Sequence, residues 1–580
     1  MFSWMEVLGQ WKHGIAYPRW AALAHWGYGE ARFLFYPPAS WTLGAALGAV
    51  LPWPIVPGAY CWIVLTLAGA AMYGLAREWL PIPDAMFAAV FYALNPYHLL
   101  IVYWRSAYAE LLAAPLLPLV LLCLIKLQEP AFNLEVSKQD FRPTLCLSLL
   151  LAAAWLTNAP AAMMIHYSTA GLALLLAVPA AVRNGSLSRR WGPQIWRPLL
   201  RTAVAILLGI GLASFYLLPT IYEQKWIDLS QVMSPGVRPQ DNFLFTKLAD
   251  PDHNRFNLLV STLAIVEICA LVLVIWVSRR WQSKRVGLVG LNGPITLNGQ
   301  GSDTAVTAAP DDNNDALRPW ILLSAWGMGS ALLMLSLSNF FWQHLPKFRF
   351  VQLPFRWLLC MNVALAMLLT VATKRWTMRL LAFGVLLTAL IIAGYRTQPP
   401  WWDTSGDIHE MSDAIADGTG YEGTDEYVPA GADASELNKS LPLVSNVSNV
   451  SDDSHDAGAP VRSEILTWGQ TEKHFVVHAA AAQDITVRLF SYPAWQVVVN
   501  GRPTATEKTE LTGLLVIPVA AGDSDIRIYF CRTIDRLVGD IVSLISLLLF
   551  VVAWFIASKP VLIMKSRPNL RPANHASRIS

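Results

Sequence analysis

Charged residues are scarce in this chain. Only 14% of its 580 residues are Asp, Glu, Lys or Arg, whereas 54% are hydrophobic and the mean hydropathy is +0.41. A soluble domain is nearer a quarter charged, so this composition excludes an ordinary soluble protein. It predicts a polytopic α-helical membrane protein that has the lipid bilayer as a partner and binds no nucleic acid.

Cysteine is also rare, and its spacing excludes two further classes. No two of the six cysteines form a Cys-x-x-Cys motif, and all but Cys531 lie in apolar segments. Neither a disulfide framework nor a thiolate metal site is therefore indicated, and we expect no metal and no cofactor. The first twenty residues lack an apolar core of the kind found in a secretory signal peptide.

The most distinctive segment that is present covers residues 10–38. It is rich in aromatic residues, Gly and Pro, but carries charges at Lys12, Arg19, Glu30 and Arg32. This mixture is too polar to span a bilayer and is typical of a loop at the membrane surface, where Trp and Tyr are enriched. The short apolar run 39–51 predicts an interfacial or re-entrant helix, which ends at Pro52 and Pro54.

Longer apolar runs predict about eleven membrane spans, since some 20 residues cross a hydrocarbon core of roughly 30 Å. The run at 144–158 is short for a span. The predicted spans are 56–76, 84–104, 107–126, 144–158, 160–182, 202–218, 257–277, 319–337, 355–373, 376–394 and 537–557.

The basic residues predict the orientation of these spans. About half of the 43 Lys and Arg residues fall in alternate loops and in the C-terminal tail, with dense clusters at 183–201 and 279–285. Short loops rich in Lys and Arg stay in the cytoplasm. The chain is thus expected in the inner (plasma) membrane with its C-terminus cytoplasmic, and the outward N-terminal loop predicts one further span upstream of Met1.

This topology gives a domain organisation. Residues 1–55 form an extracytoplasmic aromatic loop with an interfacial helix, and 56–394 form the multi-span domain. Residues 395–462 are a polar, partly disordered extracytoplasmic segment. A small all-β sandwich at 463–536 precedes the last helix at 537–557 and a basic cytoplasmic tail at 558–580.

The sandwich is predicted from short β-rich runs separated by turn signals such as Asn500-Gly501. Five to seven strands are expected. His474 and His478 share one face of a strand but would lie roughly 13 Å apart, too far to bind one metal ion.

Ionisable residues recur where the spans meet the outer surface. They are Glu30, Arg105, Glu110, Glu223, Arg349 and Arg356. One interpretation is a shared pocket in which carboxylates act as base and arginines hold a phosphate. The alternative is that Arg105 pairs with Glu110 and that the other residues cap helices or extend to the interface.

Several motifs occur in an order that resembles a known family. They are AYPRW, GYGEARFLFYPP, YWRSAYAE, FYLLPTIYEQ, FRFVQLPFRWL, YEGTDEYVP and SYPAWQVVVNG, followed by the final apolar helix. The chain is similar along almost its whole length to bacterial membrane proteins described as 6-pyruvoyl-tetrahydropterin synthase-related. It has no soluble synthase domain and no zinc-binding histidine cluster, so pterin chemistry is rejected.

The resemblance implies kinship with the integral-membrane glycosyltransferases of the GT-C class. These transfer a sugar from a polyprenyl-phosphate donor to an envelope acceptor on the extracytoplasmic side. In that class the acidic motif follows the first span, and this chain has no such motif at that place. The resemblance assigns catalytic roles to Glu30, Glu110 and Glu223, and substrate binding to Tyr17, Arg19, Trp20, Tyr36, Arg105, Tyr108, Arg349 and Arg356.

Two other functions remain open from the sequence. The missing acidic motif and the large outer domain favour a non-catalytic envelope scaffold that handles a glycan, a lipid or a protein. Secondary transport has less support, because the chain shows no paired inverted halves and its charges gather at the outer edge. The identities of the sugar and of the glycan or protein acceptor do not follow from the residues.

Overall fold

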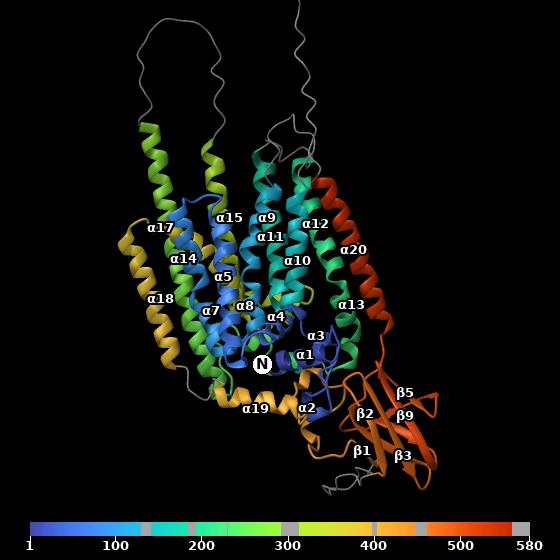
Figure 1. Cartoon of the computed structure of the whole chain (residues 1–580). Coiled ribbons are helices and arrows are strands. Elements are labelled where there is room, and N and C mark those ends of the chain that lie inside the picture. Colours follow the sequence, from blue (N-terminus) through green and yellow to red (C-terminus); the bar gives the residue numbers. More distant parts are fainter. Residues whose placement is uncertain are drawn as a thin grey trace, which may run out of the picture.

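The structure is a computed structural model that describes residues 1–128, 141–183, 193–228, 230–291, 312–396, 403–446 and 461–558. Most of these residues are helical. Figure 1 shows that the long helices run side by side as a bundle and that two small β-sheets lie beside one end of it. We call this end of the bundle the sandwich end.

Apolar runs form the long helices, since a helix satisfies its backbone polar groups internally. Eleven helices make up the bulk of the bundle: α5 (Val56–Ala76), α6 (Ile82–Ala93), α9 (Leu116–Gln128), α10 (Arg142–Thr157), α11 (Ala159–Arg183), α12 (Pro193–Leu212), α14 (Pro251–Leu291), α15 (Asp312–Leu333), α17 (Leu358–Ala372), α18 (Trp376–Arg396) and α20 (Ile534–Ser558).

Shorter helices connect or cap these. They are α1 (Phe2–Lys12), α2 (Ala24–Gly27), α3 (Arg32–Phe35), α4 (Pro38–Gly48), α7 (Pro96–Leu100), α8 (Tyr108–Ala113), α13 (Ser214–Glu223), α16 (Asn339–His344) and α19 (Ser405–Ala416). In Figure 1, α1, α2, α3 and α19 lie across the sandwich end. The predicted helix near 39–51 is α4. The predicted loop at 10–38 contains the last residues of α1 and the four-residue helices α2 and α3, and most of α1 precedes it.

Each of the eleven predicted spans falls on a helix, but they are not alike. Within the described residues, seven helical segments are long and apolar enough to cross a membrane. Two further segments, around 196–226 and 319–344, bend by 73° and 93° and could each form one broken span. The remaining two, Arg142–Thr157 and Trp376–Thr388, are shorter apolar helices.

The predicted span at 202–218 contains the first of these bends, between α12 and α13, and α20 explains part of it. At the start of α13 the backbone N–H of Phe215 donates to Ser543 Oγ of α20 at 2.8 Å instead of continuing the α12 ladder. Pro219 then removes one more backbone donor. At the second bend, the indole N–H of Trp342 caps the carbonyl of Leu333 at 3.1 Å.

Nine strands form two antiparallel sheets, which we call the β domain. They are β1 (Val444–Asn446), β2 (Ser463–Trp468), β3 (Glu472–Ala479), β4 (Gln483–Phe490), β5 (Trp495–Val499), β6 (Arg502–Thr504), β7 (Glu507–Lys508), β8 (Leu514–Val519) and β9 (Gly522–Phe530). The sheet orders are β1-β4-β8-β7 and β2-β3-β9-β5-β6. Inward-facing residues of both sheets share one buried cluster.

The five strands expected from β-rich runs are confirmed as β3, β4, β5, β8 and β9. The total of nine exceeds the five to seven strands expected. The strands β1, β6 and β7 escaped prediction because two or three residues carry little periodicity, and β2 escaped because its six residues show no alternation of buried and exposed positions. The turn at Asn500-Gly501 has positive φ at both residues, as a tight hairpin requires. The segment 395–462, predicted as partly disordered, contains α19 and β1; its residues 447–460, like 559–580 of the tail, lie outside the described part.

The β domain and the N-terminal loop share a core. Trp20, Tyr28 and Leu34 are almost fully buried within the β domain's cluster. The Trp20 ring lies 5.5 Å from that of Tyr492 and 5.6 Å from that of Trp495, centroid to centroid. Aromatic pairs at such distances add to the stabilisation from buried area, so the β domain is fixed to the loop rather than loosely tethered.

The final helix also packs closely, at Gly539 of α20. A Cβ atom there would lie 2.7 Å from the carbonyl oxygen of Ser214. We expect Gly539→Ala to force α20 away from α13 and to destabilise the protein by roughly 1–3 kcal/mol. Thermal unfolding in detergent measures this. Gly384→Ala on α18 is the matched control, because nothing lies within 4 Å of its Cβ position; equal effects of the two substitutions would contradict the close crossing.

Candidate functional site

Glu110 lies at the start of α8 and is buried between two arginines. Its Oε2 atom is 2.7 Å from Arg105 Nη1 and 3.1 Å from Arg356 Nε, and the Tyr97 hydroxyl donates to Oε1. Arg356 also donates to the carbonyl of Val351 at 2.6 Å. We call Tyr97, Arg105, Glu110 and Arg356 the Glu110 cluster. Arg105, Glu110 and Arg356 lie at the ends of three predicted spans, and Tyr97 lies within the first of these spans. The pairing of Arg105 with Glu110 is the structural alternative that the sequence left open.

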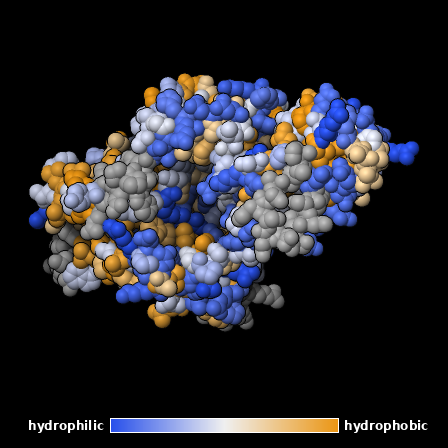
Figure 2. Space-filling view, turned by 90° about the horizontal axis from the view of Figure 1, so that it is seen from below, coloured by the Kyte–Doolittle hydropathy of each residue, from blue (hydrophilic) through white to orange (hydrophobic). Residues whose placement is uncertain are grey.

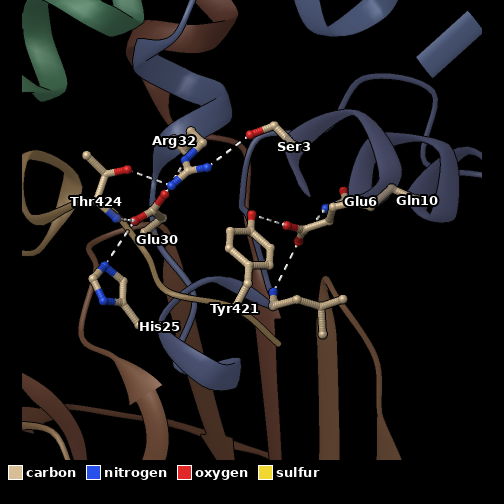
Figure 3. Close-up of polar contacts among 9 residues, drawn as sticks. Ser3, Glu6, Gln10, His25, Glu30, Arg32, Tyr421 and Thr424 are labelled. Carbon is tan, nitrogen blue, oxygen red and sulfur yellow. Dashed lines mark hydrogen bonds and ion pairs between the residues drawn. The ribbon is translucent and has the colours of Figure 1, made fainter. Parts of the chain in front are cut away.

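Glu30 lies in a second cluster, and its own side chain has no exposed surface. It forms an ion pair with Arg32, and its Oε2 atom lies 3.0 Å from His25 Nε2 and accepts a 2.8 Å hydrogen bond from the backbone N–H of Thr424. Figure 3 shows this Glu30 cluster joining the N-terminal loop to the segment that follows α19. His25 and Trp26 both have positive φ, 50° and 55°, which is strained for residues with a Cβ.

The segment 420–424 fits this strained turn closely. Tyr421 forms a parallel β-bridge with Ala24, and a Cβ at Gly423 would lie 2.0 Å from the His25 ring. Only glycine fits at that position without displacing the imidazole. The motifs GYGEARFLFYPP and YEGTDEYVP, far apart in the sequence, therefore meet in one structural unit.

Glu6 of α1 lies beside the Glu30 cluster and differs from it in having no cationic partner within ion-pair distance in the described chain. Its carboxylate accepts hydrogen bonds from the Tyr421 hydroxyl at 2.6 Å and from the backbone N–H of Leu23 at 3.1 Å, and Gln10 Nε2 lies at 3.4 Å. Figure 3 shows these donors around the carboxylate. Burial raises the pKa of Glu6 from 4.5 to about 7, although both hydrogen bonds act in the opposite direction.

Glu223 ends α13 and holds the last helix. Arg536 of α20 donates two hydrogen bonds to it, from Nε to Oε1 at 2.7 Å and from Nη2 to Oε2 at 2.9 Å. The Tyr492 hydroxyl of the β domain donates to Oε2 at 2.6 Å. Glu223 and Arg536 are 0% and 3% exposed. This Glu223 clamp fixes the β domain, α13 and α20 to one another, which is a structural task.

Arg19 and Tyr17 still have free polar groups at the sandwich end. The Arg19 guanidinium lies over the Tyr17 ring, 4.5 Å from its centroid, and forms no ion pair with any residue that the structure describes. The Tyr17 hydroxyl is buried and has no hydrogen-bond partner among the residues that the structure describes. Just before them, Trp11, Gly14 and Ala16 line an open hollow of about 310 Å³.

Figure 2 shows that the surface seen from the sandwich end is hollowed near its middle, with both hydrophilic and hydrophobic residues around the depression. Trp20 does not contribute an accessible surface, because it is 2% exposed within the β domain's core. Tyr36 is 37% exposed, so its side chain can meet a ligand.

Two further predicted binding residues lie elsewhere at this end. The Tyr108 ring packs against those of Trp4 and Tyr60, at 5.0 and 5.5 Å between centroids. Arg349 is exposed and has a cation–π contact with Phe350 at 5.8 Å. Neither residue takes part in the three carboxylate clusters within the described contacts.

The sequence-predicted residues thus group only in part. Arg105, Glu110 and Arg356 come together, whereas Glu30 and Glu223 each belong to a cluster of their own. The partners that sequence reasoning missed are mainly Glu6, Tyr421 and Arg536. Their signal in the sequence was weak, because a single Glu, Tyr or Arg gains a functional interpretation only from the residues that it contacts in the folded protein. In the part of the chain that is described, no three His, Cys, Asp or Glu side chains gather as a metal site.

Comparison with protein-family models finds no match, and comparison with curated proteins finds no significant similarity.

The clamp generates a stability prediction. Arg536→Met would leave the buried Glu223 carboxylate without its counter-charge, and we expect a loss of about 3–5 kcal/mol. The double variant Glu223→Gln, Arg536→Met removes both charges and should recover much of this loss. Unfolding of the purified protein in detergent measures both; equal losses in the single and double variants would show that the two charges are not coupled.

Glu6 generates a pH prediction. Since its pKa is about 7 in the folded protein and 4.5 when unperturbed, its contribution to stability is complete below about 4.5 and is lost as the pH rises through 7. The loss is on the order of 3 kcal/mol. Glu6→Gln should remove this pH dependence, measured as the difference in unfolding free energy from wild type. The exposed Glu410→Gln on α19 is the control and should leave the profile unchanged.

Proposed function

We propose that the chain is an integral-membrane glycosyltransferase that moves a sugar from a polyprenyl-phosphate donor to an acceptor of the cell envelope. In this proposal all eleven apolar helical segments lie in the inner (plasma) membrane. The sandwich end faces the extracytoplasmic side, and the C-terminus is cytoplasmic. The seven long apolar helices and the two bent pairs support a multi-pass arrangement, and the ordered motifs support kinship with the GT-C class.

The observation that carries the proposal is the free polar chemistry at the sandwich end. Arg19 has no carboxylate partner in the described chain, and Tyr17 has a buried hydroxyl without a partner, immediately after the residues that line the hollow. A guanidinium with open donors binds phosphate well. Tyr36, exposed in the same loop, adds an aromatic surface on which a sugar ring can stack.

The reaction makes two demands on the protein. The acceptor hydroxyl loses its proton to a base while its oxygen bonds to the anomeric carbon, and the bond from that carbon to the phosphate oxygen breaks. The polyprenyl phosphate leaves with the electron pair and gains one negative charge. Arg19 would stabilise this charge, as preorganised donors do in many enzymes.

The base is the harder assignment. Glu30, Glu110 and Glu223 are each buried and ion-paired to arginine, so taking up a proton would break a contact that holds the structure together. Glu6 is held by neutral donors, and its pKa of about 7 suits proton transfer near neutral pH. It lies on α1, the helix that also contributes Trp11 to the hollow. We therefore place Glu6 as the base.

One observation favours a second function, a non-catalytic envelope scaffold. The three carboxylates predicted as catalytic are saturated by internal partners, as structural charges are. In this case the β domain and the N-terminal loop, fixed together through Trp20, would present a rigid surface for a glycan or protein. Binding of envelope glycans by the whole protein without any sugar transfer would favour it.

The decisive experiment measures transfer of a labelled sugar from a polyprenyl-phosphate donor by the protein in lipid nanodiscs. We expect Arg19→Ala to lower the rate roughly 100-fold, a loss typical of removing one charge-stabilising donor. Arg255→Ala is the control, because Arg255 is an exposed arginine near the start of α14 and is not among the residues that line the hollow. Equal rates in the two variants would refute the role of Arg19, and no transfer by wild type would favour the scaffold.

A further inference from the structure

A polar group lies in the middle of the bundle, away from the sandwich end. Glu267 of α14 is 4% exposed, and its Oε2 atom accepts a 2.9 Å hydrogen bond from Asn362 Nδ2 of α17. The same Asn362 nitrogen lies 3.3 Å from Asn95 Oδ1. Asn362 and Asn95 are 1% and 0% exposed. Each of the three residues falls near the middle of an apolar segment long enough to span a membrane.

Asn95 marks a break in its segment. It separates α6 from α7 and precedes Pro96, which has no backbone N–H to donate. The Asn95 side chain supplies hydrogen bonds on both sides of the break. Its Nδ2 donates to the carbonyl of Tyr92 at 2.6 Å, and its Oδ1 accepts from the backbone N–H of His98 at 3.0 Å. Broken helices at this depth are where many transporters bind small cations.

The group has more acceptors than donors. The Oε1 atom of Glu267 and the Oδ1 atom of Asn362 are both buried and have no hydrogen-bond partner among the described residues. Within the described part of the chain, the Asn362 amide nitrogen is the one donor that hydrogen-bonds to the carboxylate. A buried oxygen without a donor costs free energy, and a carboxylate without a counter-charge costs more.

No charged side chain nearby supplies that counter-charge. On the elements packed against α14, the titratable or charged residues at this level are Cys360 of α17 and Arg356 of η8 (Pro354–Trp357), which is engaged by Glu110. Residues 319–333 of α15 contain none. His98, next to the break, has its Nδ1 at 3.1 Å from the carbonyl of Ala93. None of these forms an ion pair with Glu267 in the described chain.

We propose that Glu267, Asn362 and Asn95 form an exchangeable site for one small monovalent cation, a proton or a sodium ion. Either cation neutralises the carboxylate. A proton supplies the missing donor, and a sodium ion would satisfy several orphan oxygens together. The inference depends on the proposed membrane location of the bundle and not on sugar transfer, so it can stand if the transferase proposal fails.

Glu110 provides an internal comparison. It is buried in the same bundle, but two arginines and a tyrosine hydroxyl already satisfy its carboxylate. It has no need of an external cation. A reagent that reads protonated carboxyls in apolar surroundings should therefore distinguish Glu267 from Glu110.

The test uses the full-length protein in nanodiscs and dicyclohexylcarbodiimide, which adds a carboxylic O–H group across one of its C=N bonds. Mass spectrometry maps the adduct from mildly acidic to mildly alkaline pH. Sodium is compared with choline at constant ionic strength. We expect labelling at Glu267, decreasing as the pH rises, with Glu110 unlabelled. Several-fold suppression by sodium identifies a sodium site, and pH dependence without a sodium effect identifies a proton site.

Thermal unfolding gives an independent measurement. A cation that binds only the folded protein raises its stability with concentration. In choline buffer, wild type should lose stability relative to Glu267→Gln as the pH rises, because the carboxylate must then ionise without a partner. Labelling that is absent, or unchanged by both pH and sodium, would overturn the proposal. If Glu267→Gln does not fold, the wild-type labelling alone decides.

Discussion

Burying a carboxylate away from water is the constraint on which this structure depends. An ion removed from water must be matched by charge or by well-placed donors. Glu110, Glu30 and Glu223 are each matched by arginine. Each carboxylate also has a partner far away in the chain, which is Arg356 for Glu110, the backbone of Thr424 for Glu30 and Arg536 for Glu223. The loss of one partner would leave an uncompensated buried charge, so these contacts specify where the loop, the last helix and the β domain must lie.

The same constraint explains why the N-terminal loop and the C-terminal region act as one unit. The Glu30 cluster recruits the backbone of Thr424, and the Glu223 clamp recruits Arg536 and Tyr492. Between them, Trp20 fills the core of the β domain. The segment that follows α19 and the β domain thus both contact the N-terminal loop. These contacts can keep the strained turn at His25 in place.

The sequence could predict much of the fold but less of the site. Long apolar runs locate each bundle helix, since hydrophobic length is encoded locally, and short β-rich runs locate β3, β4, β5, β8 and β9. The bends near residues 213 and 335 were missed because they depend on contacts such as Phe215 with Ser543. The pairing of Arg105 with Glu110 was accessible, being five residues apart, whereas that of Glu223 with Arg536 joins residues 313 positions apart.

The contrast among the buried carboxyls then orders them by what each can do. Arginine-paired carboxylates have their charge fully compensated, so proton uptake would cost a stable ion pair, and they are suited to holding the structure. Glu6, held by a tyrosine hydroxyl and a backbone amide, can change protonation without leaving an unpaired arginine. Glu267 has even fewer donors and a free oxygen. Chemistry that moves protons or cations is therefore expected where compensation is incomplete, and the acids that the sequence makes most conspicuous are the ones that the fold has already used.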